Sequence, residues 1–116
     1  MKIIEVIGLD CSKKENETLV YKAALSLPFF KNSDLESLDA TMLEGAIKKM
    51  QDKYPIMVGY IFCSKNSKFP HFSIMIKHSE NNAMLGTIYA LCLKEGLAKV
   101  AIFEYDYIKN YLKGGQ

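Results

Sequence analysis

Residues 55–63 read PIMVGYIFC and residues 71–78 read HFSIMIKH, and these two segments decide the fold of the chain. The first is apolar at nearly every position, as in a strand that is covered on both faces. The second alternates Phe72, Ile74 and Ile76 with more polar residues, as in a strand with one exposed face. The link SKNSKFP (64–70) is rich in turn formers. We therefore expect a hairpin on which the flanking helices pack.

The spacing of apolar residues predicts five further elements. They are a strand over residues 2–9, a helix over 13–26, a helix over 34–53 that is broken near 39–41, a helix over 79–96 and a last strand over 99–108. Capping-box patterns, in which a Ser hydroxyl and a Glu carboxylate satisfy first-turn amides, begin the first two helices. Gly96 stands where a left-handed C-terminal cap is expected.

The resulting order is β-α-α-β-β-α-β within one α/β (α+β) domain over residues 1–116. If the first two helices form one interrupted crossover, this order is the two-layer ferredoxin-like plan. A mixed sheet with helices on both faces is the alternative, because three predicted strands are apolar on both sides.

Charge and composition favour an ordinary soluble domain. The basic residues number 15 against 13 acids, which gives a net charge of +2 with both signs interspersed. All the basic residues are Lys, so the planar Arg fork that commonly clamps phosphate and reads guanine is missing. No signal peptide and no apolar run of about 20 residues is evident. We expect a cytoplasmic protein that does not enter a membrane.

The three cysteines, Cys11, Cys63 and Cys92, are dispersed and lack zinc-ligand spacing. The sequence therefore predicts no metal site and no cofactor. Cys11 lies at the predicted turn from strand to helix, where helix amide dipoles lower the pKa of a thiol. Lys13 and Lys14 would add to this effect. Cys11 is therefore the candidate nucleophile or redox-sensing thiol.

His71 and His78 are candidate general bases, since histidine titrates near neutral pH. The period of two along a strand sends them to opposite faces, so they do not share a metal ion. Four acids on the predicted strands would do acid/base work or bind cations if two of them met at a sheet end: Glu5, Asp10, Glu104 and Asp106.

Large apolar and aromatic side chains on the predicted strands form the candidate binding or interface surface. They are Tyr60, Ile61, Phe62, Phe103, Tyr105 and Tyr107. A sheet face of this kind needs a cover, and the ferredoxin-like order places the first hairpin strand at an edge, where a long uncharged strand invites pairing.

The sequence thus favours a small non-catalytic domain that binds a protein partner or a small ligand as a homodimer. The alternative is a thiol-dependent enzyme or redox sensor that uses Cys11. Single-stranded nucleic acid bound on the sheet aromatics is the weaker alternative, and the lack of Arg disfavours it.

Residues 25–38, LSLPFFKNSDLESL, together with Lys94-Glu95-Gly96 before the last predicted strand, resemble barstar-type ribonuclease inhibitors. The family's Gly between the aromatic pair and the second helix is missing, and so is its Trp within that helix. The resemblance therefore implies neither an activity nor a site residue for this chain.

Overall fold

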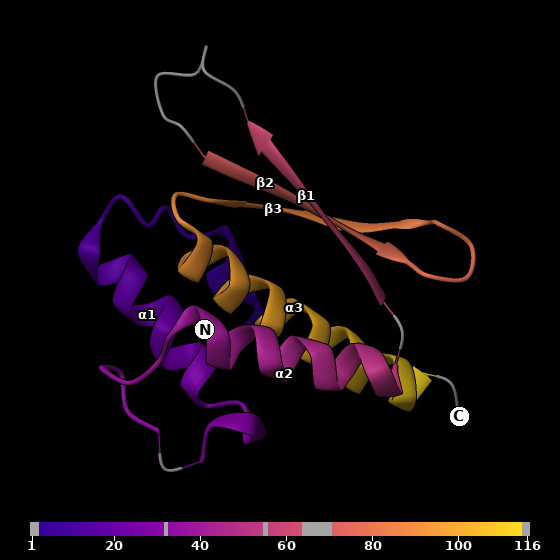
Figure 1. Cartoon of the computed structure of the whole chain (residues 1–116), viewed down its shortest axis with the longest axis horizontal. Helices are drawn as coiled ribbons and strands as arrows, with labels where there is room; N and C mark the ends of the chain where they lie inside the picture. Colours follow the sequence, from indigo (N-terminus) through magenta and orange to yellow (C-terminus); the bar gives the residue numbers. More distant parts are fainter. Residues whose placement is uncertain (1–2, 32, 55, 64–70, 115–116) are drawn as a thin grey trace.

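The computed structural model describes residues 3–31, 33–54, 56–63 and 71–114. The elements, in order, are η1 Ile3–Gly8, α1 Lys14–Leu25, η2 Pro28–Phe30, α2 Ala40–Lys53, β1 Ile56–Cys63, β2 His71–His78, β3 Met84–Ala90 and α3 Leu93–Gly114. They form two layers, with an antiparallel sheet packed by one face on the helices (Figure 1). The chain is a small mixed α+β domain.

The predicted hairpin is confirmed and carries a third strand. The sheet order is β1-β2-β3, so β1 lies at an edge as expected. Ile74 of β2 pairs with Tyr60 on one side and with Ile88 on the other, and all three strands are antiparallel. Residues 64–70, expected as the surface link of the hairpin, lie outside the described residues.

The strand expected over residues 2–9 is wrong, since η1 is a 3-10 helix. A short run of Ile and Val does not distinguish a buried strand from a helical turn. Among residues 4–8 of η1, Val6 is the one buried residue, while Glu5 and Gly8 are exposed. The segment packs on α1 and α3, so it adds no strand to the sheet.

The helix expected over residues 79–96 is also wrong, because β3 occupies residues 84–90. Ile88 and Ala90 are buried while Thr87 and Tyr89 are exposed, which is the period of two of a strand. Asn82, which lies between β2 and β3, adopts a positive φ of 59°. Such a left-handed residue is typical of a tight turn, so a second hairpin stands where we expected a helix to begin.

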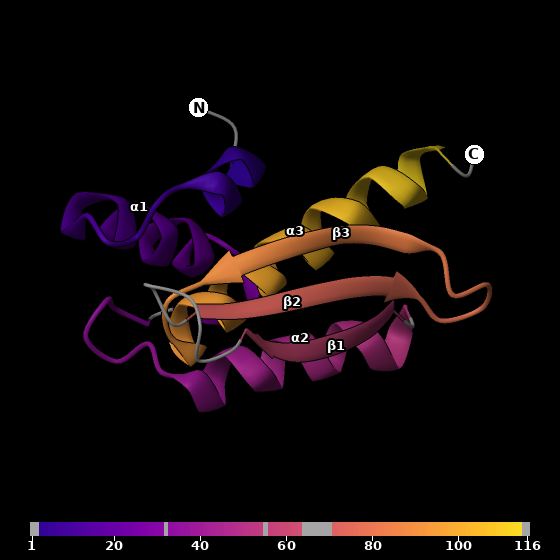
Figure 2. The ribbon, with the colours of Figure 1, turned by 90° about the horizontal axis from the view of Figure 1, so that it is seen from above.

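The last predicted strand, residues 99–108, lies inside the 22-residue helix α3. Phe103, Tyr105 and Tyr107 therefore lie on a helix and not on a sheet. Residues 95–102 are all buried, because α3 crosses beneath the sheet beside α1 and α2 (Figure 2). Burial on all sides hides the helical period that would reveal an amphipathic helix.

Gly96 allows close packing of α3 on the sheet and does not form the C-terminal helix cap that we expected. It lies near the start of α3, where an added Cβ would be 2.8 Å from Cδ1 of Ile74. Ile74 is only 1% exposed, so this contact leaves little room for a side chain. Glycine at this position allows α3 to approach the middle strand of the sheet.

With η1 and α3 helical, the described residues do not form the β-α-α-β-β-α-β order or the ferredoxin-like sheet. The alternative of a mixed sheet with helices on both faces is also not observed. All strand pairs are antiparallel, and the helices gather on one face of the sheet (Figures 1 and 2). None of the helices in the described part has the length and apolar content of a membrane span.

The two early helices are confirmed, with different caps from those expected. The N-cap of α1 is Lys13, which makes no side-chain cap bond. The N-cap of α2 is Asp39, whose carboxylate accepts a hydrogen bond from the Met42 amide at 2.8 Å. The break predicted near residues 39–41 is therefore the true beginning of the second helix.

Glu104 is a buried acid in the packing between α2 and α3. It is 0% exposed, and its Oε1 accepts a hydrogen bond from Nε2 of Gln51 at 3.0 Å. Its Oε2 finds no hydrogen-bond partner among the described residues. Burial raises the pKa of this carboxyl to about 7.

Glu104→Gln should remove a pH dependence of stability. The folded-state pKa lies above the ordinary value of 4.5, so the folded chain keeps a proton that the unfolded chain releases, and stability falls as pH rises through this window. We expect wild type to lose about 3 kcal/mol of unfolding free energy from this group between about pH 4 and pH 8. Urea unfolding across this range measures the loss, and the variant should not show it.

Glu44→Gln on the exposed side of α2 provides the matched control and should keep the wild-type profile. Identical pH profiles for wild type and Glu104→Gln would show that Glu104 is not held in a raised-pKa environment.

Candidate functional site

A cavity of about 560 Å³ opens where the segment after η1, the end of β3 and the start of α3 meet. Its size lies within the range of small-molecule sites. Its lining comprises Ile7, Gly8, Leu9, Asp10, Cys11, Thr87, Tyr89, Ala90, Leu91, Glu95 and Lys99.

A buried ion pair forms the polar part of this cavity. Nζ of Lys99 lies 2.7 Å from Oε2 of Glu95, one helical turn away on α3, and both side chains are at most 3% exposed. The same ammonium donates to the carbonyl of Leu9 at 3.0 Å and to that of Tyr89 at 3.1 Å. An ammonium has three protons, so Lys99 has an acceptor for each of them.

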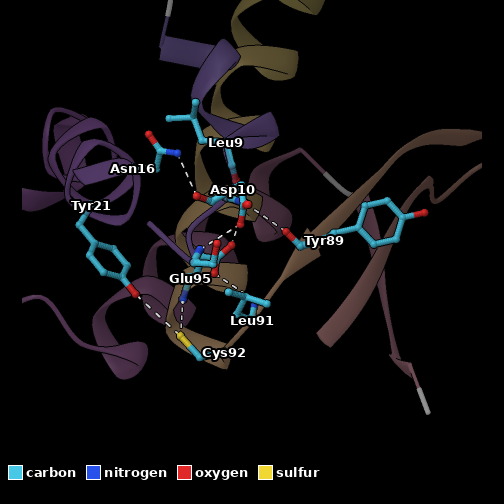
Figure 3. Close-up of polar contacts among 10 residues, drawn as sticks. Leu9, Asp10, Asn16, Tyr21, Tyr89, Leu91, Cys92 and Glu95 are labelled. Carbon is cyan, nitrogen blue, oxygen red and sulfur yellow. Dashed lines mark hydrogen bonds and ion pairs between the residues drawn. The ribbon is translucent and has the colours of Figure 1, made fainter. Parts of the chain in front are cut away.

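Glu95 also fixes the turn between β3 and α3. Its Oε1 accepts a hydrogen bond from the Leu91 amide at 3.0 Å, and its own amide lies 3.5 Å from Sγ of Cys92. Figure 3 shows that these bonds run from Tyr21 through Cys92 to Glu95, with the Tyr21 hydroxyl 3.8 Å from the sulfur. The turn that enters α3 is therefore held by side chains as well as by the backbone.

The segment after η1, which includes Asp10 and Cys11, forms a hydrogen-bonded turn on the rim of the cavity. The carboxylate of Asp10 accepts a hydrogen bond from the Ser12 amide at 3.0 Å, and this bond lowers the pKa of Asp10. The carbonyl of Asp10 accepts a hydrogen bond from Nδ2 of Asn16 at 2.9 Å (Figure 3). These bonds pre-organise the turn that carries Cys11.

Cys11 lines the cavity, but its environment is the opposite of the one predicted. The residue is 7% exposed, and burial raises the pKa of its thiol to about 12. The nearby Glu95 carboxylate adds to the rise, more than Lys99 offsets it. The thiol is therefore protonated at neutral pH, and the expected lowering of its pKa by the helix dipole is wrong.

The two histidines occupy opposite ends of β2. His78 lies beside the turn to β3, with its amide bonded to the Ala83 carbonyl at 2.8 Å and its Nδ1 accepting from the Glu80 amide at 3.2 Å. The cavity lies at the other end of β3, so His78 is not a base for Cys11. The backbone of His71 follows the register to the cavity end of the sheet, and its side chain lies outside the described residues.

The predicted interface residues come from two elements, β1 and α3. Tyr60, Ile61 and Phe62 belong to β1, and their side chains lie outside the described part. Phe103 on α3 reaches Gly86 of β3, where an added Cβ would be 3.0 Å from its ring. Tyr105 meets Phe29 edge to face with ring centroids 6.3 Å apart, and Tyr107 is half-buried on the same helix.

Among the predicted site residues whose side chains the structure describes, Cys11 is the one that lines the cavity. Asp10 from the predicted acid set also lies there, whereas Glu104 and Asp106 are on α3. Sequence reasoning missed Lys99 and Glu95, because it placed them in a strand and at a helix end. Their spacing of four residues is typical of a helical ion pair and could have identified them in the sequence.

The arrangement offers a hollow with an apolar wall and one buried ion pair. Each proton of the Lys99 ammonium has an acceptor, and the Cys11 thiol is protonated at neutral pH. No group of three or more metal-ligating side chains occurs among the described residues. The walls of the cavity are largely apolar, with Ile7, Leu9 and Leu91 among them.

The chain matches no protein-family model, no curated protein and no solved structure. The resemblance of residues 25–38 to barstar-type inhibitors therefore gains no support from a family match. Function must be argued from the geometry alone.

Cys11 should resist alkylation. A thiol with a pKa of about 12 supplies very little thiolate near pH 8, whereas Cys92 is an exposed free thiol of the same chain. We expect iodoacetamide at about pH 8 to label Cys92 many times faster than Cys11. Peptide mapping by mass spectrometry at timed intervals measures both rates in one sample.

Equal labelling rates for the two cysteines in folded protein would contradict the raised pKa and restore the thiol-enzyme hypothesis. A circular dichroism spectrum recorded on the same samples verifies that the protein stays folded during labelling.

Proposed function

We propose that this chain is a non-catalytic binding domain of the cytoplasm that acts as a homodimer joined through the β1 edges. The observation that carries the proposal is the edge strand itself. It spans eight residues, Ile56–Cys63, with the sequence IMVGYIFC. Natural edge strands usually carry a charge, a proline or a covering segment that blocks further pairing.

The position of β1 supports pairing with a second copy. Within the described residues, β1 is bonded to β2 and to no other strand, so one row of its amides and carbonyls faces away from the sheet. Two such strands related by a two-fold axis would pair antiparallel and extend the sheet across both subunits. Each subunit then contributes the same uncharged strand, β1, to the contact.

The other edge of the sheet is less available. The Tyr89 carbonyl of β3 accepts a hydrogen bond from Lys99, and η1 packs beside this strand. A Lys ammonium on the backbone is one of the devices that protect an edge from pairing. This asymmetry favours β1 over β3 as the contact between subunits.

Binding without catalysis is the role that best fits the cavity beside Cys11. Its volume of about 560 Å³ suits a small ligand, and its apolar walls suit an uncharged one. The free thiols of Cys11 and Cys92 are typical of a reducing compartment. These features support a ligand-holding dimer of the cytoplasm.

Ile61→Lys should dissociate the dimer, because it places a charged ammonium on the paired edge strand of each subunit. The measurement is the molar mass by size-exclusion chromatography with light scattering. Wild type should elute at twice the chain mass of 13.1 kDa, and Ile61→Lys should elute at the chain mass. Tyr60→Lys extends the test to the other strand face, since successive residues alternate.

Met84→Lys provides the control, since Met84 is an exposed residue of β3 outside the described cavity lining and the same charge is added to the opposite edge strand. It should leave the mass of the dimer unchanged. Wild type that elutes as a monomer at every concentration would defeat the proposal, as would Lys variants of β1 that lose stability while still assembling.

A further inference from the structure

A second cavity, of about 350 Å³, lies in the helical layer. Its described lining comes from η2, the end of α2 with Tyr54 after it, and the second half of α3. Helices α2 and α3 pack on one another and lie side by side in Figure 1, and Figure 2 shows that they diverge toward their C-terminal ends. The cavity is therefore built on the most closely packed pair of helices.

Three lysines rim this cavity without an acid among its lining residues. Lys49 and Lys53 lie one helical turn apart on α2, and Lys109 faces them from α3. All three are exposed, and the single ion pair found among the described residues does not involve them. Like charges gathered around one hollow repel each other, and a bound anion relieves this repulsion.

None of the acids of α2 and α3 lines the cavity. Asp52 is exposed on α2 and does not line the cavity. The carboxylate of Asp106 on α3 accepts a hydrogen bond from Asn110 at 3.1 Å, and Glu104 is buried against Gln51. The described lining of the cavity therefore carries three lysines and no acid.

Aromatic rings supply the apolar wall of the same cavity. Phe29, Tyr54 and Tyr105 all line it, and the edge-to-face pair of Phe29 and Tyr105 fixes the orientation of two rings. Phe29 is 38% exposed, although large aromatic side chains are usually more buried. Nζ of Lys53 lies 5.5 Å from the Tyr54 ring centroid, so charge and ring face occur together.

We propose that this cavity binds a small aromatic phosphate, with the phosphate among the three lysines and the ring against Phe29 and Tyr105. Lysine binds phosphate as a point charge without the Arg fork. Three lysines attract a doubly charged phosphate more strongly than they attract a singly charged carboxylate. This site does not depend on pairing through β1, and neither proposal requires the other.

The dimensions favour a small molecule over a polymer. A volume of about 350 Å³ is at the lower end of the range for ligand pockets. Binding of single-stranded nucleic acid requires a charged groove that tracks several nucleotides. Here three lysines surround a single cavity, which suits one phosphate group and not a row of phosphates along a strand.

The test uses four probes on the folded full chain, namely phenyl phosphate, its fragments inorganic phosphate and phenol, and a short oligodeoxythymidylate, with affinities from ligand-observed NMR. Phenyl phosphate should bind about tenfold or more tightly than either fragment, because only it uses both the lysines and the rings. Its affinity should fall as salt is added.

Lys49→Met should weaken phenyl phosphate about tenfold, which corresponds to the loss of one charge-assisted contact. Lys48→Met is the matched control, since Lys48 is the exposed neighbour on α2 that does not line the cavity, and it should change the affinity less than about twofold. Tyr105→Leu should reduce the preference for phenyl phosphate over inorganic phosphate and leave the binding of inorganic phosphate unchanged.

Three outcomes would overturn the proposal. The first is no binding of phenyl phosphate, and the second is an equal loss of affinity in Lys48→Met and Lys49→Met. The third is a short oligodeoxythymidylate that binds more tightly than phenyl phosphate and is weakened equally by both Lys variants, which would assign the surface to nucleic acid.

Discussion

The ammonium of Lys99 joins three segments that no regular backbone pairing connects. It lies on α3, contacts Glu95 one turn away, and holds the carbonyls of Leu9 and Tyr89. Taking a lysine and a glutamate out of water costs several kcal/mol unless geometry and hydrogen bonds compensate. Here all three ammonium protons have acceptors, so the buried charge fixes the segment after η1, β3 and α3 in one arrangement.

This constraint explains both the cavity and the inertness of its thiol. The turn that carries Cys11 is attached to the sheet through Leu9 and Lys99, which leaves a hollow between them instead of a closed core. The same attachment places Cys11 beside Glu95, whose carboxylate disfavours a thiolate. A feature that resembled a reactive cysteine in the sequence is therefore part of a structural cluster.

The hairpin, α1 and α2 could be predicted from sequence because each shows a clear period and recognisable boundaries. The wrongly predicted elements are those in which burial hides the periodicity of the apolar residues. Val100 and Ile102 alternate as in a strand, but Ala101 between them is equally buried in α3. Once α3 had been placed as a strand, Glu95 and Lys99 could not be recognised as a helical pair, so the candidate site was predicted only at Cys11.

The most direct test of this account is the unfolding free energy of Lys99→Met, measured by urea denaturation. Removal of the ammonium leaves Glu95 buried and unpaired, which should cost about 3 to 5 kcal/mol. Lys22→Met, at an exposed position of α1, should change the unfolding free energy by less than about 0.5 kcal/mol. A loss in Lys99→Met no larger than that of Lys22→Met would contradict the central role of the Lys99 cluster.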